Sequence, residues 1–208
     1  MPSYPGGFAT ASADHMNLHQ RSDMTRVTKR LGEVQRDGDR VGTRYERILA
    51  HPPAEVWRAI TESDHLRHWF PADILGERRA GAEIRFRFWP ETLEQASAEP
   101  TEMEVELEDP ELPGRILTWE PPHIFEFLWD DEHLRFELLA EEPGTRLVCT
   151  VWFGTPGPHG ISGTATGYHV CLDELVDSLA GRPIGMPDPD AVAELCRRYT
   201  EAVEATSG

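Results

Sequence analysis

Hydrophobic and polar residues alternate in short runs through the middle of the chain, between Arg26 and Phe153. Alternation of period two with one polar side predicts antiparallel strands that bury one face and leave the other in water. The turn signal Asp37-Gly38-Asp39 joins the segments 26–36 and 40–50 into a first hairpin. The apolar positions of the later strands are Ile84, Phe86 and Phe88; Met103, Val105 and Leu107; Phe125, Phe127 and Trp129; Leu134, Phe136 and Leu138; and Leu147, Cys149, Val151 and Phe153.

Clusters of turn-forming residues separate these strands, and we assign residues 90–100 and 110–114 to loops or turns. Short connections favour antiparallel neighbours. One antiparallel pair that this permits is strand 82–89 with strand 101–108. If these two strands pair, Arg85 and Arg87 are the natural cross-strand partners of the acidic residues on the solvent face, Glu102, Glu104, Glu106 and Glu108.

Helical patterns occur after the first hairpin and again at the end of the chain. His51-Pro52-Pro53 begins a short helix, and a second short helix follows it before Pro71. A long helix is predicted from about Thr164 to Ala180, before Gly181. Its apolar face consists of Ala165, Tyr168, Leu172, Leu175, Val176 and Leu179. A last helix starts at Asp188-Pro189 and has the apolar stripe Val192, Leu195, Cys196, Tyr199 and Val203.

These elements predict an α+β fold in which a curved antiparallel sheet of six to seven strands surrounds one long helix. Two short helices follow the first strands, and an extra helix ends the chain. We divide the chain into a disordered tail (1–24), one domain (25–183) and a C-terminal helical extension (184–208). Because one long helix covers a broad sheet lined by large aromatic residues, we expect a pocket between them.

Several stretches of sequence resemble the START-like, or SRPBCC, superfamily. They are the run from Tyr45 to Thr61, the run His65-Leu-Arg-His-Trp-Phe-Pro, and Thr118-Trp-Glu-Pro-Pro followed by Phe125-Glu-Phe-Leu-Trp. Within it, the chain is similar to the branch named after activator of Hsp90 ATPase homologues, and the similarity spans roughly residues 26–182. The resemblance implies the helix-grip fold, shared with the birch pollen allergen. It also implies a ligand-sized cavity, in a superfamily that includes lipid carriers, aromatase/cyclases, antibiotic self-sacrifice proteins and chaperone regulators.

Composition narrows the range of partners and compartments. The net charge of −17 disfavours nucleic acid and anionic lipid, because both are bound through cationic groups. No run approaches the roughly 18 apolar residues of a membrane helix, and no signal peptide is visible. Cys149, Cys171 and Cys196 lack a C-x-x-C spacing and are typical of reduced thiols. We expect a cytoplasmic protein.

The leading hypothesis is non-catalytic binding or sequestration of a small hydrophobic ligand, aromatic or polyketide-like, in an internal cavity. We expect no cofactor and no metal, since no cofactor motif occurs and His65 and His68 lack a third ligand. The expected ligand-binding residues are the aromatic side chains of the strands and short helices, together with three residues of the long helix. They are Trp69, Phe70, Phe86, Phe88, Trp119, Phe127, Trp129, Phe136, Tyr168, His169 and Leu172.

Two other classes of function remain open. An enzyme of cyclase, aromatase or hydrolase type could use His169, Tyr168, Cys171 or Arg47 as pocket groups. A protein-interaction module could act as a chaperone-linked regulator, or as a homodimer formed through a sheet edge or the last helix.

Overall fold

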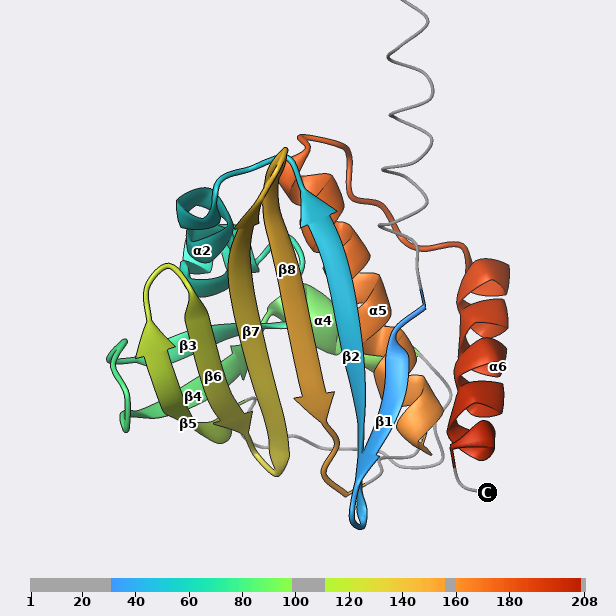
Figure 1. The fold of residues 1–208 in the computed structure, drawn as a ribbon. Helices are drawn as coiled ribbons and strands as arrows, with labels where there is room; N and C mark the ends of the chain where they lie inside the picture. The colour runs from blue at the N-terminus through green and yellow to red at the C-terminus, as the bar shows by residue number, and fades with distance from the viewer. Residues whose placement is uncertain (1–30, 99–110, 156–159, 207–208) are drawn as a thin grey trace, which may run out of the picture.

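The computed structural model describes residues 31–98, 111–155 and 160–206, with the backbone alone for 95–98. The described residues contain one antiparallel sheet of eight strands in the order β1-β2-β8-β7-β6-β5-β4-β3 (Figure 1). The strands are β1 (Glu33–Asp37), β2 (Arg40–Leu49), β3 (Ala72–Gly76), β4 (Glu83–Phe88), β5 (Glu111–Glu120), β6 (Ile124–Trp129), β7 (Glu132–Glu141) and β8 (Gly144–Trp152).

The predicted alternation sets the two faces of this sheet. In β6, Phe125, Phe127 and Trp129 are buried while their neighbours are only partly covered. Every pair of neighbouring strands is antiparallel, as the short connections predicted. The α+β class and the curved sheet around a long helix are confirmed, with more strands than the six to seven expected.

The helices are α2 (Pro53–Thr61), α3 (Ser63–Leu66), α4 (Pro90–Ala98), α5 (Gly160–Leu179) and α6 (Pro189–Ala205). They lie on one side of the sheet, and α6 lies beyond α5, next to the β1 edge (Figure 1). Gly181, at φ +63°, follows the long helix as predicted, because glycine adopts this left-handed conformation without steric cost. In the described part of the chain, no helix is long and apolar enough to cross a membrane.

Two predicted loops are wrong. Residues 90–98 form α4, which begins at Pro90 and Glu91, a proline and an acidic residue in a first helical turn. Residues 111–120 form β5, although Pro113 and Gly114 indicated a turn. A Cβ on Gly114 would lie 2.4 Å from Cε2 of Phe86, so glycine is required here for close packing inside a strand.

The pairing considered for strand 82–89 with strand 101–108 is not the one that β4 makes. β4 is already paired on both sides, with β3 and with β5. Arg85 and Arg87 form ion pairs with Glu111 of β5, at 3.3 Å for Arg85 and 2.6 Å for Nε of Arg87. Residues 101–108 themselves lie outside the described residues, as does the predicted tail 1–24.

At the outer edge of β3, side chains close in sequence form hydrogen bonds with the backbone of Ile74. The amide of Ile74 donates to Oδ1 of Asp73 at 2.8 Å. The carbonyl oxygen of Ile74 accepts from the guanidinium of Arg78 at 2.5 Å. Both backbone groups of Ile74 therefore have partners within the same short segment.

Candidate functional site

Aromatic side chains fill the space between the sheet and the helices. Phe86 stacks on Trp129 with ring centroids 4.8 Å apart, and Phe125 lies 4.6 Å from Phe127. At the α2 end of the same cluster, Trp119 packs edge-on against Trp57 at 4.8 Å. The cluster therefore forms the core of the protein.

Most of the predicted ligand-binding residues lie in or beside this core. Phe86, Phe127, Trp129, Phe136, His169 and Leu172 are buried, and Phe88, Trp119 and Tyr168 are partly buried against it. Tyr168 also donates a hydrogen bond to the carboxyl group of Glu132. Their contact with a ligand stays a prediction.

A groove of about 780 Å³ lies along α5. Its floor is one face of α5, because Gly163, Gly167, Val170 and Glu174 recur at intervals of three or four residues. Trp69, Phe70 and Trp89 form one wall, and Ile184, Met186, Val192 and Cys196 of the α5–α6 connection and α6 form the other. Two predicted residues, Trp69 and Phe70, thus line this groove.

The aromatic wall of the groove is held in place by hydrogen bonds. The indole N–H of Trp69 donates to the carbonyl oxygen of Ala59 at 2.9 Å, and that of Trp89 donates to the carbonyl oxygen of Phe70 at 2.8 Å. The guanidinium of Arg67 lies 5.6 Å from the ring centre of Trp89. Two indole rings are therefore fixed before any ligand arrives.

The floor of the groove carries two titratable groups with altered acidity. Burial, together with the neighbouring charges of Asp177 and Asp173, raises the pKa of Glu174 to about 7. Burial and the charge of Glu174 raise the pKa of Cys171 to about 12. At neutral pH the Cys171 thiol is therefore protonated and a weak nucleophile.

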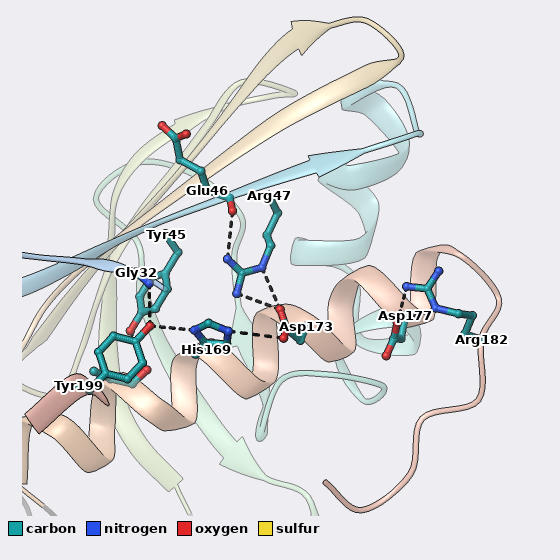
Figure 2. A network of polar contacts seen from close by, with 10 residues as sticks. Gly32, Tyr45, Glu46, Arg47, His169, Asp173, Asp177, Arg182 and Tyr199 are labelled. Carbon is teal, nitrogen blue, oxygen red and sulfur yellow. Dashed lines mark hydrogen bonds and ion pairs between the residues drawn. The ribbon is translucent and has the colours of Figure 1, made fainter. Parts of the chain in front are cut away.

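A second polar arrangement connects β2, α5 and α6 (Figure 2). The buried Arg47 donates from Nε to Oδ1 of Asp173 at 3.0 Å and from Nη1 to the carbonyl oxygen of Glu46 at 3.0 Å. Nε2 of His169 lies 3.5 Å from Oδ2 of the same Asp173. Both oxygens of this carboxylate thus face basic groups.

The network continues from His169 to α6. Nδ1 of His169 lies 2.8 Å from the hydroxyl of Tyr199, which also accepts the amide N–H of Gly32 at 2.9 Å (Figure 2). Burial raises the pKa of Tyr199 to about 12, so the hydroxyl keeps its proton and can donate it to His169. Both ring nitrogens of His169 are therefore engaged within the protein.

Sequence reasoning missed Tyr199 and Asp173 as polar partners. Tyr199 appeared only as part of an apolar stripe, and Asp173 lies outside the apolar face predicted for the long helix. The available signal was Arg47, which lies in phase with the buried Tyr45 and Leu49 and needs a counter-ion.

The two histidines considered for metal binding lie in different surroundings. His68 lines the groove, while His65 lies 3.9 Å from Glu62. Among the described residues, no group of three or more His, Cys, Asp or Glu side chains is placed to hold a metal ion.

Comparison with known structures supports the fold. The conserved protein of unknown function EF2215 from Enterococcus faecalis has a TM-score of 0.65 at 19% identity, covering 91% of this chain and 97% of its own. CalU16 from Micromonospora echinospora has a TM-score of 0.55 at 18% identity, covering 84% of this chain and 94% of its own. At these identities the similarity shows the fold alone.

Comparison of sequences gives the family. No curated protein sequence matches the chain. The family model described as Activator of Hsp90 ATPase homolog 1-like protein matches residues 50–180, which is more than half of the chain. As the sequence resemblance predicted, the chain belongs to the family of Activator of Hsp90 ATPase homolog 1-like proteins.

Proposed function

We propose that this protein binds a small, mainly apolar ligand in the groove over α5 and does not transform it. The observation that carries this proposal is the groove itself, with a volume of about 780 Å³. Ligand sites of proteins commonly have volumes of roughly 300–1,000 Å³ and mostly apolar linings. The two hydrogen-bonded indoles of Trp69 and Trp89 favour a flat or aromatic ligand.

Binding is favoured over catalysis by the state of the candidate catalytic groups. His169 is buried and uses both ring nitrogens within the protein. Arg47 is committed to Asp173, and the Cys171 thiol in the groove has a raised pKa. A general base or nucleophile must be a free group that faces the substrate and has a pKa suited to the reaction.

The groove floor offers a test that separates binding from folding. A Cβ on Gly167 would meet no atom within 4 Å, so a larger side chain there projects into open space. Gly167→Leu should fold normally and occupy the groove, whereas Gly167→Ala should leave most of it open.

The experiment screens a library of small aromatic compounds by thermal shift and tryptophan fluorescence. We expect at least one compound to raise the melting temperature and quench fluorescence in the wild type and in Gly167→Ala, but not in Gly167→Leu. A library without any such compound, or binding that is unchanged in Gly167→Leu, contradicts the proposal.

We further propose a cytoplasmic location, supported by free thiols at Cys149, Cys171 and Cys196. Fractionation of the host cell tests this location. A homodimer formed through α6 stays a prediction, which light scattering on the full chain decides.

A further inference from the structure

The groove contains a half-buried carboxyl group for which the described part of the chain supplies no cationic partner. Within residues 31–98, 111–155 and 160–206, Glu174 forms no ion pair or hydrogen bond through its side chain. Its acidic neighbours on α5 differ in this respect, since Asp173 binds Arg47 and Asp177 binds Arg182 at 2.7 Å. Glu174 is therefore the acid of this helix that is left for an external cation.

The surroundings of Glu174 make an external cation favourable. Neighbouring carboxylates and partial burial destabilise its charged form, and they raise its pKa to about 7. A cation placed in the groove would relieve both effects at once. A neutral apolar ligand would relieve neither, and an anionic ligand would add to the repulsion.

The other titratable groups of the groove do not supply that cation. Cys171 on α5 and Cys196 on α6 are thiols, and His68 lies in the loop after α3. Arg67 and Glu91 come from the aromatic side of the groove and carry opposite charges, so together they contribute no net charge. The Arg67 guanidinium lies over Trp89 and makes no ion pair with Glu174 within the described residues.

We propose that the groove selects ligands that combine an aromatic or similar apolar body with a protonated amine, for which Glu174 is the counter-ion. This inference rests on the proposed binding function. The apolar body lies along the indoles of Trp69 and Trp89, and the ammonium group lies at the α5 floor. A charge pair in such a partly desolvated site distinguishes ligands that differ by one charge.

Three matched probes test the charge preference by titration calorimetry at pH 8. They share a naphthalene ring and carry a cation, a neutral group or an anion: 1-naphthylmethylamine, 1-naphthylmethanol and 1-naphthylacetate. We expect the amine to bind wild-type protein about tenfold more tightly than the alcohol, and the acetate to bind more weakly than both. In Glu174→Gln the amine and the alcohol should bind within about twofold of each other.

Proton release gives a second readout. Because a bound cation lowers the pKa of Glu174, the amine should release protons at pH 7, seen as a binding enthalpy that varies with the ionisation enthalpy of the buffer. The alcohol should release none, and neither should Glu174→Gln with the amine. Glu204→Gln, which removes an exposed carboxylate of α6 outside the groove, is the control and should keep both the preference and the proton release.

The outcomes separate the two proposals. If the alcohol binds as tightly as the amine and Gly167→Leu blocks both, the groove binds apolar ligands and the inference about Glu174 is wrong. If none of the probes binds and the aromatic library also gives no ligand, both proposals fail. A preference for the amine that persists in Glu174→Gln overturns the assignment of Glu174.

Discussion

The hydroxyl of Tyr199 on α6 lies 2.8 Å from Nδ1 of His169 on α5, in a region closed to solvent. The same hydroxyl accepts the amide of Gly32, so one side chain joins the last helix, the long helix and the residue before β1. This contact explains how a helix with a mostly exposed surface is held in place.

Tyr199→Phe removes the hydroxyl and keeps the ring. It leaves the Gly32 amide and His169 Nδ1 without a partner in a buried site, which should cost about 1–3 kcal/mol of unfolding free energy. Chemical denaturation measures this loss, with far-UV circular dichroism as the check on folding. Thr200→Ala, at an exposed position of the same helix, should change little, and equal losses in the two variants would contradict the network.

The ion pair between Arg47 and Asp173 should respond unequally to the loss of each partner. Arg47 is fully buried, whereas the side chain of Asp173 is 35% exposed and can be solvated alone. Asp173→Ala leaves a buried, uncompensated guanidinium and should cost about 3–5 kcal/mol. Arg47→Met should lower the unfolding free energy by clearly less, because the remaining Asp173 can be solvated. Denaturation of both variants and of the double variant tests this order, and a larger loss in Arg47→Met would show it to be wrong.

Two glycines should respond in opposite directions to alanine. Gly167 lies inside α5 with open space at its Cβ position, so Gly167→Ala should stabilise the protein by about 0.5–1 kcal/mol. At Gly114 the new Cβ would lie 2.6 Å from the carbonyl oxygen of Leu128, so Gly114→Ala should destabilise it. Melting temperatures that shift in the same direction would contradict this pair of expectations.

Glu174 should make stability depend on pH. Its folded pKa of about 7 lies above the ordinary glutamate value of 4.5, so the free energy of unfolding falls as the pH rises from 4.5 to 7. Glu174→Gln should therefore be more stable than wild type at pH 8, by on the order of 1 kcal/mol given its partial exposure. The difference should disappear near pH 4. Denaturation of both proteins across this pH range measures the difference in unfolding free energy. A difference that does not change with pH would contradict the role of Glu174.

The sequence alone was enough to predict the architecture, because alternation and helical period are local properties. The stop at Gly181 and the cap at Asp188, which accepts the amide of Asp190 at 3.1 Å, were visible as local signals. β5 was missed because Pro113 and Gly114 have the chemistry of a turn, while the requirement for glycine comes from the distant Phe86. Local preference was overridden there by tertiary packing.

The candidate site could be predicted only in part, for a similar reason. A helical period divides α5 into a buried and an exposed side, but α6 covers a flank that the period assigns to solvent. In the same way, Asp173 lies outside the predicted apolar face although it pairs with Arg47 of β2. The groove joins Trp69, Trp89 and Met186, which lie far apart in the chain, so only the folded arrangement brings them together.

The end of the sheet at β3 also bears on how the protein behaves at high concentration. An exposed edge strand normally offers its amides and carbonyls to a strand of another molecule, which is a common route to aggregation. At Ile74 both groups are already bound, by Asp73 and Arg78. Replacing Asp73 and Arg78 with alanine would free the amide and the carbonyl oxygen of Ile74. The edge of β3 could then form hydrogen bonds with a strand of another molecule.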